Sequence, residues 1–220
     1  SVLQKSDING IYEKDGYLCA MEYPMEEDSI IRAAKIFEGI YEKYLQDSEV
    51  NAYFSVIPDK SYFLPKEEFP VGGDEWVIAK MQEYLTDAEY IDLYPCLTVD
   101  DYYRTDLHWR QEAVLDVAEL LLMKMQKVKE TDYQVTEMTD AFYGGYAGAS
   151  AYQGKPDSLY EVMSSDISNA VVYDYEKKQE ASVYAPEKLE GMDPYDYYLW
   201  GARALLSIKN QNIQNGEKLL

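Results

Sequence analysis

The residues best suited to chemistry lie in one stretch, Tyr102-Tyr103-Arg104-Thr105-Asp106-Leu107-His108-Trp109, which holds the single histidine of this 220-residue chain. Histidine is the side chain whose charge changes near neutral pH without a special environment. A carboxylate beside it fixes the tautomer of the imidazole and stabilises its protonated form, as in the Asp–His half of a hydrolase triad. Asp106 stands two positions before His108. The pattern therefore indicates acid–base chemistry.

The two-residue spacing of Asp106 and His108 requires a particular backbone conformation if their side chains are to meet. Residues two apart lie on the same side of an extended segment, whereas on a helix they are about 200° apart. Apolar residues recur at helical spacing over residues 111–128, which predicts a helix after the stretch. A catalytic pair thus requires a non-helical loop that leads into that helix. A second interpretation stays open, because Thr105 or Asp106 is also a suitable N-cap for the helix, with His108 at the surface.

Charge narrows the classes of partner. The formal net charge of −21 argues against nucleic acid and against an anionic membrane surface, since both bind through clustered lysine and arginine. A well-solvated, soluble surface is the simplest interpretation. No Asp-x-Asp-x-Asp-Gly loop is present, and two cysteines with one histidine give no zinc spacing. We therefore predict no metal and no cofactor; metal-assisted hydrolysis through Asp106 and His108 is a weaker alternative.

Size and composition set further limits. A chain of this length suits one sizeable α/β domain or two small ones. No apolar run is long enough to cross a bilayer, and the first fifteen residues lack the apolar core of a signal peptide. Cys19 and Cys96 form either one disulfide or two buried thiols. The 23 tyrosines suit half-buried strands or a stacking surface for sugars, which favours carbohydrate slightly.

Helix and strand signals alternate in the first half of the chain. The turn pairs Asn9-Gly10 and Asp15-Gly16 predict a small hairpin. Helices are predicted over residues 29–46 and 74–85, and strands over residues 50–57 and 90–94. This order predicts an α/β fold with an open, mostly parallel sheet and flanking helices, whose carboxyl edge would carry the site.

The pattern changes in the second half. The Gly/Tyr-rich stretch 142–150 is predicted as a plain loop, because no phosphate-binding context surrounds it. Strands at 166–175 and 180–184, joined by a turn at 176–179, predict a smaller antiparallel excursion.

We expect a single domain over residues 1–220. It would consist of a core at 1–130 that carries the motif, an insertion at 131–200 and a return to the sheet at 201–220. The last four residues, Glu217–Leu220, read as the first half of a strand, which predicts that the native chain continues and that its last strands are missing here.

The stretch 102–109 resembles the signature of the bacterial DHHW proteins. Those belong with the SGNH-hydrolase-like domains of the alginate O-acetyltransferases, in which an Asp-x-His-Trp motif supplies the catalytic aspartate and histidine. Residues 9–18 are similar to the family's N-terminal hairpin, and residues 56–60 are similar to its strand–Pro–x–Lys stretch. Residues 193–206 with 216–220 look like the run into its serine block.

The resemblance implies an SGNH-like fold and acetyl transfer or ester hydrolysis on a glycan through a Ser-His-Asp triad. His108 would be the general base and Asp106 would orient it. Trp109 would wall the pocket. Tyr103, Arg104 and Arg203 would be further substrate-binding candidates. It also implies an extracellular or cell-surface protein, with any membrane anchor outside this chain.

Two departures from the family pattern matter. Leu107 stands where the first of the two family histidines stands. No Gly-Asp-Ser or Asp-Ser-Tyr stretch follows Trp200, and Asp157-Ser158 and Asp28-Ser29 lie in the wrong context. We therefore expect the nucleophilic serine to be missing and this chain to be inactive as it stands. The alternative is a non-catalytic pseudo-hydrolase domain that binds surface glycans or a protein partner.

Overall fold

The structure, a computed structural model, describes residues 7–21, 25–65, 73–127, 131–210 and 212. The chain divides into two compact units, Ser1–Tyr102 with Ala113–Val128 and Tyr103–Glu112 with Lys129–Leu220. The described residues form a mixed α/β structure with four small sheets. Among them no helix is both long and apolar enough to cross a membrane.

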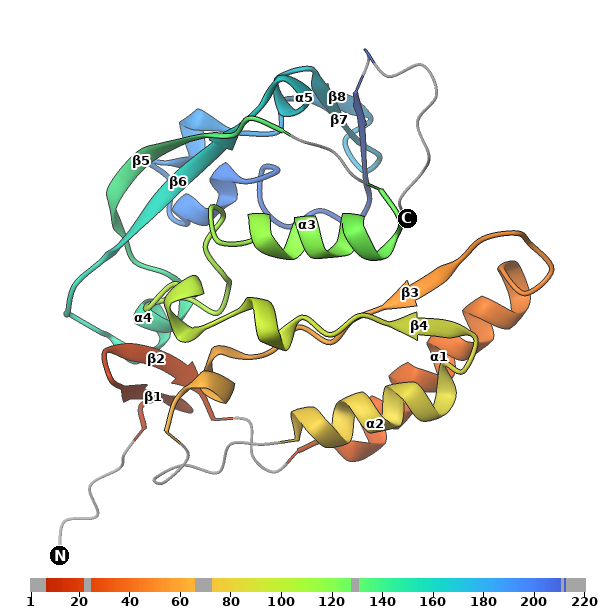
Figure 1. Ribbon diagram of the computed structural model, residues 1–220. Coiled ribbons are helices and arrows are strands. Elements are labelled where there is room, and N and C mark those ends of the chain that lie inside the picture. The colour runs from red at the N-terminus through yellow and green to blue at the C-terminus, as the bar shows by residue number, and fades with distance from the viewer. Residues whose placement is uncertain (1–6, 22–24, 66–72, 128–130, 211, 213–220) are drawn as a thin grey trace, which may run out of the picture. The chain divides into compact units, whose positions relative to one another are not determined.

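The first unit begins with the predicted hairpin. β1 (Ile11–Lys14) and β2 (Tyr17–Ala20) pair antiparallel, as Figure 1 shows in red. Asp15 and Gly16 join them with φ of 50° and 83°, and this left-handed pair matches the twist of a two-residue hairpin. Tyr12, Tyr17, Cys19 and Leu64 form the buried cluster behind the hairpin. Cys19 and Cys96 are both free thiols.

All three helices predicted for this unit are present. The first two have boundaries within two residues of the prediction, whereas the third, predicted over residues 111–128, is confined to Leu115–Lys124. α1 (Glu27–Tyr44) and α2 (Asp74–Tyr84) pack against each other. They lie on one side of the parallel pair β3 (Ala52–Phe54) and β4 (Ala88–Tyr90) (Figure 1). The short helices η1 (Lys60–Phe63), η2 (Tyr94–Cys96) and η3 (Val99–Asp101) and helix α3 (Leu115–Lys124) complete the unit.

The predicted open, mostly parallel sheet is not found in the described residues, where parallel pairing is confined to β3 and β4. Both strands are shorter than their apolar runs. After the backbone bond from Ile91 to Phe54, the chain at Ser55 bonds through its side chain, whose hydroxyl donates to the Ile91 carbonyl at 2.9 Å. Ile57 is 59% exposed. The run at 50–57 thus contains β3 but overstates its length, whereas β4 lies mostly before the run at 90–94 and shares only Tyr90 with it.

The second unit is dominated by antiparallel pairing. β5 (Gln134–Phe142) and β6 (Asp157–Met163) form a long irregular ribbon. β7 (Ala170–Asp174) lies between β8 (Gln179–Ala181) and β9 (Leu206–Asn210) in a three-stranded sheet. Three further short helices are α5 (Ser165–Ser168), η4 (Pro186–Lys188) and η5 (Pro194–Tyr197).

The antiparallel excursion predicted for this half is present as β7 and β8, but three details differ. The stretch 142–150 is not a plain loop, because α4 (Gly145–Ser150) forms there. The strand predicted from residue 166 starts at Ala170, since the Ser164 hydroxyl caps α5 by accepting from the Ile167 N–H. The return to the core sheet predicted for 201–220 is not found in the described residues, where β9 pairs antiparallel with β7 instead; residues 217–220 lie outside the described residues.

Aromatic side chains make the core of the second unit. Its buried cluster consists of Tyr103, Phe142, Leu159, Tyr184, Tyr197 and Tyr198. Buried tyrosines require partners for their hydroxyls, and strand β6 supplies two of these. Tyr184 donates to the Val162 carbonyl at 2.6 Å, and Tyr198 donates to the Tyr160 carbonyl at 2.8 Å. Part of the tyrosine excess is therefore interior packing.

Candidate active site

The motif residues form a closed, non-helical loop in the second unit. The Tyr103 N–H donates to the His108 carbonyl at 3.1 Å and closes the turn, while the fully buried Tyr103 ring anchors it in the core. Helix α3 begins only at Leu115, and no side chain caps its start. The alternative in which Thr105 or Asp106 is the cap of this helix is therefore wrong, and the loop has the backbone that an Asp–His pair requires.

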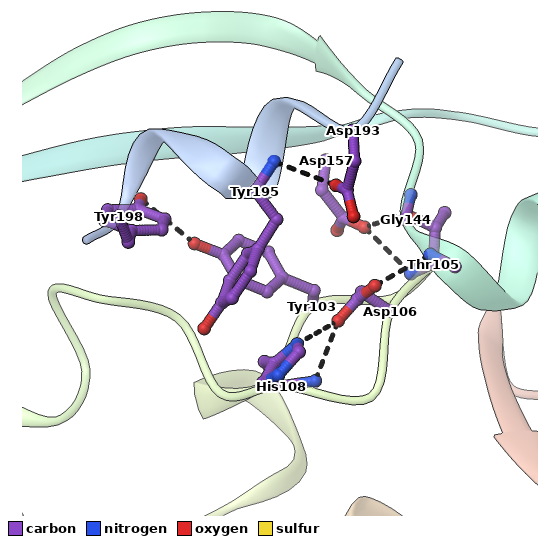
Figure 2. A network of polar contacts seen from close by, with 10 residues as sticks. Tyr103, Thr105, Asp106, His108, Gly144, Asp157, Asp193, Tyr195 and Tyr198 are labelled. Carbon is purple, nitrogen blue, oxygen red and sulfur yellow. Dashed lines mark hydrogen bonds and ion pairs between the residues drawn. The ribbon is translucent and has the colours of Figure 1, made fainter. Parts of the chain in front are cut away.

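Asp106 and His108 form a hydrogen-bonded pair (Figure 2). Asp106 Oδ1 accepts from His108 Nδ1 at 2.5 Å and from the His108 backbone N–H at 3.0 Å. An ionised carboxylate only accepts, so Nδ1 carries the proton and Nε2 is the basic nitrogen of the neutral ring. Within the described residues Nε2 has no hydrogen-bond partner. The His108 side chain is 39% exposed and that of Asp106 only 7%, so a buried acid holds an open imidazole.

The second oxygen of Asp106 is bound by the start of α4. The Gly145 N–H donates to Asp106 Oδ2 at 2.7 Å. Gly144 lies so close that an added Cβ would collide with the Asp106 Cβ and come within 2.8 Å of its Cα. The glycine-rich stretch is therefore needed for close backbone approach, one of the uses of glycine in proteins. Sequence reasoning missed this role because it predicted a plain loop here, once no phosphate-binding context was found around the glycines.

These contacts set the charge state of Asp106. Burial alone would raise the pKa of its carboxyl group, but the hydrogen bonds from the His108 ring, the His108 backbone and the Gly145 N–H outweigh burial and lower that pKa below its usual 3.8. The carboxylate is thus ionised at neutral pH, as an imidazole-orienting acid must be.

The lowered pKa predicts a pH dependence of stability. An acid whose folded pKa is depressed stabilises the fold above the unfolded pKa, and that contribution disappears as pH falls through the folded pKa. We expect wild-type chain to exceed Asp106→Asn in free energy of unfolding at pH 6–7, and the difference to shrink below pH 3.8. Urea unfolding across this range measures it; a difference that grows toward low pH would contradict the assignment.

A second acid, Asp157 at the start of β6, also binds the loop. Its Oδ2 accepts from the Thr105 N–H at 2.8 Å and from the Thr105 hydroxyl at 2.6 Å, and its Oδ1 accepts from the Arg104 N–H at 2.9 Å. The Thr105 hydroxyl in turn accepts from the Gly144 N–H at 3.0 Å. Figure 2 shows this network beside the Asp–His pair. It joins loop, strand and helix α4 into one frame.

Replacing Asp157 by alanine should cost about 3–5 kcal/mol of unfolding free energy, because the buried Thr105 N–H and hydroxyl and the part-buried Arg104 N–H lose a charged acceptor. Asp157→Asn keeps one acceptor oxygen and should cost clearly less. Urea unfolding of the two variants measures the difference. Equal stability of wild type and Asp157→Ala would show that the network is not formed in solution.

An aromatic ring covers one face of the imidazole. Tyr195 of η5 stacks on His108 with ring centroids 4.1 Å apart and planes 13° from parallel. The Asp193 carboxylate fixes the start of η5 by accepting from the Tyr195 N–H at 3.0 Å. Sequence reasoning missed both Tyr195 and Asp157, because they are 87 and 49 positions from His108 and no local pattern links them to the motif.

The residues proposed from the sequence to bind substrate have different surroundings. Tyr103 is fully buried, and its hydroxyl meets that of Tyr198 at 3.3 Å; it packs in the core and offers no surface to a ligand. Arg203 pairs with Asp174 of β7, with Nε 3.3 Å from Oδ2. The Arg104 side chain is exposed and Trp109 is half-buried. Binding by Trp109, Arg104 and Arg203 stays a prediction.

Comparisons with known proteins identify a shared fold. No family model and no curated protein sequence match this chain. A DHHW family protein from Eubacterium siraeum DSM 15702 has a similar structure, with a TM-score of 0.73 at 20% identity over 94% of this chain and 73% of that protein. PatB1 of Bacillus cereus has a TM-score of 0.69 at 16% identity over 93% of this chain and 77% of that protein.

A second structure of PatB1, which carries a sulfonyl adduct, is also similar. Its TM-score is 0.67 at 16% identity, over 93% of this chain and 74% of that protein. At identities this low the comparisons establish the fold and leave the chemistry to be argued from the site.

Proposed function

We propose that this chain is a DHHW-type, SGNH-like domain of a carbohydrate esterase or O-acetyltransferase, and that Asp106 and His108 activate a serine nucleophile. One observation carries the proposal. The imidazole is bound to a buried carboxylate through Nδ1 and is open to solvent elsewhere, which is the geometry of a general base. The motif resemblance and the fold shared with a DHHW protein and PatB1 support it.

The chemistry follows from which nitrogen is free. His108 Nε2 takes the proton of a serine hydroxyl as the serine oxygen attacks the carbonyl carbon of an acyl ester. Asp106 stabilises the imidazolium that results. When the tetrahedral intermediate collapses, the imidazolium returns the proton to the leaving oxygen and an acyl-serine remains. Nε2 then deprotonates a sugar hydroxyl, which gives acyl transfer, or a water, which gives hydrolysis.

The serine is expected from a part of the native protein that is not in this sequence. No Asp-Ser block follows Trp200, and the chain covers about three quarters of its structural neighbours. A sulfonyl adduct, as in one PatB1 structure, is the kind of product that an activated nucleophile forms with a sulfonyl electrophile. We infer that a downstream segment would supply the serine together with further strands of a parallel sheet, and that the 220 residues alone are inactive.

The substrate class and location belong to the same proposal. An acylated glycan of the cell surface or exterior fits the motif resemblance, and the strong negative charge disfavours nucleic acid as a partner.

The test begins with the gene. The sequence after Leu220 should encode a strand ending in an Asp-Ser block. The full-length protein, mixed with an activated acetyl ester, should gain the mass of one acetyl group on that serine, whereas the 220-residue chain should gain none. A full-length protein that has no such block, or that never becomes acylated, would refute the enzyme assignment.

A pseudo-hydrolase is the second candidate, because the nucleophile is absent from this sequence. It predicts that the chain binds surface glycan, that His108→Ala leaves this binding unchanged and that acylation never occurs. The enzyme proposal instead predicts lost turnover with retained binding in the same variant.

A further inference from the structure

Among the described residues, Tyr195 is the aromatic ring stacked on the imidazole. The two rings are nearly parallel at 4.1 Å, so the whole face of His108 on that side is covered. Asp106 binds the edge of the ring that carries Nδ1. Figure 2 shows His108 between these two contacts. One contact fixes an edge of the ring and the other fixes a face.

Tyr195 is itself held from behind by the aromatic core. Its ring meets Tyr198 at 5.2 Å, Tyr103 at 6.1 Å and Phe142 at 6.3 Å between centroids. Those three rings are buried, and side chains in a packed interior have little room to move. The Tyr195 ring that packs on His108 is therefore held in a fixed position.

A packed ring beside His108 matters because one hydrogen bond does not fix the orientation of an imidazole. Asp106 allows the ring to tilt about the Nδ1 bond, and rotation about the bond between Cβ and Cγ swings Nδ1 away from the carboxylate. A stacked ring at van der Waals distance blocks rotation toward its side.

We propose that Tyr195 is a positioning residue, whose ring sets the plane of His108 so that Nδ1 stays on Asp106 and Nε2 faces solvent. The proposal rests on the proposed function only for its catalytic consequence. The ring, not the hydroxyl, does this: within the described residues the Tyr195 hydroxyl makes no hydrogen bond. Burial and the nearby Asp106 charge raise the pKa of Tyr195, so the ring stays neutral.

The single histidine makes the test direct, since every imidazole signal comes from His108. With 13C,15N-histidine in the intact chain, NMR should show nuclear Overhauser contacts between the His108 and Tyr195 rings. The His108 ring protons should also be shifted upfield by the Tyr195 ring current. The Nδ1–H resonance should be visible and protected from exchange. Absence of the ring-to-ring contacts in wild type would overturn the proposal without any variant.

Three variants separate positioning from mere packing. Tyr195→Phe should keep the upfield shift and the protected Nδ1–H resonance. Tyr195→Leu should lose both, with the population of the Asp106-bound ring falling about two- to tenfold relative to its alternatives. Tyr175→Leu, at an exposed tyrosine directly after β7 that packs edge-on against Tyr173, is the matched control and should match wild type.

Two results would contradict the proposal: a Tyr195→Leu chain, folded by circular dichroism, that keeps the protected Nδ1–H resonance, or a Tyr195→Phe chain that loses it. Neither readout depends on catalysis. If the NMR results hold and the full-length protein still lacks acyl transfer, the proposed function fails while the positioning role stands.

Discussion

Replacing His108 by glutamine in the full-length protein should lower turnover of an activated acetyl ester by about 10⁴-fold or more. Glutamine has no basic nitrogen, so nothing removes the proton from the serine as it attacks. Asp106→Asn should lose about as much, because the amide NH₂ no longer accepts from Nδ1 and favours the wrong tautomer of the ring. Initial-rate kinetics with an activated ester measure both effects.

Two controls separate the loss of proton transfer from a general loss of structure or binding. Tyr175→Phe removes only a hydroxyl from an exposed tyrosine and should leave kcat unchanged. Glycan binding should survive in His108→Gln, since the loss concerns proton transfer and not the surface. A His108→Gln protein that turns over ester within tenfold of wild type would rule out His108 as the general base.

Gly144→Ala should be the most damaging small substitution near the site. The new methyl group would collide with the Asp106 Cβ and approach its Cα to 2.8 Å. Because the contact involves backbone, the loop or α4 must move, and overpacking of this kind costs about 1–3 kcal/mol or more. The same movement separates Asp106 from the Gly145 N–H, so the full-length variant should also lose most of its turnover. Urea unfolding and kinetics report the two effects.

Gly148→Ala is the matched control within the same short helix. An added Cβ there meets nothing within 4 Å, and alanine is favoured over glycine in a helix by up to about 1 kcal/mol. We expect unchanged or slightly raised stability and normal activity. If the two variants behaved alike, the close approach of Gly144 to Asp106 would be disproved.

Local signals predicted the elements of the fold better than their pairing. The Asp15-Gly16 turn and the periodicity of α1 and α2 are encoded in neighbouring residues and were found within a residue or two. Sheet composition depends on partners far along the chain. The apolar runs near Phe54 and Tyr90 did pair parallel, but the long β5–β6 ribbon was missed because polar residues fill β5.

At the candidate site, too, contacts between neighbouring residues were predicted and contacts between distant residues were not. Asp106 and His108 are two positions apart, so their pairing followed from spacing once the loop was taken as non-helical. Gly144, Asp157 and Tyr195 reach the pair only through folding. Tyr103 shows the opposite error, since its place in the motif suggested a surface role and its full burial assigns it to the core.

The most direct test of the account is the tautomer of the single imidazole. The 15N chemical shifts of His108, recorded in the 220-residue chain at a pH where the ring is neutral, should show a proton on Nδ1 and none on Nε2. Asp106→Asn should abolish that preference. A ring protonated on Nε2 in wild type, or one indifferent to Asp106→Asn, would contradict the claim that a buried carboxylate aims a basic nitrogen at solvent.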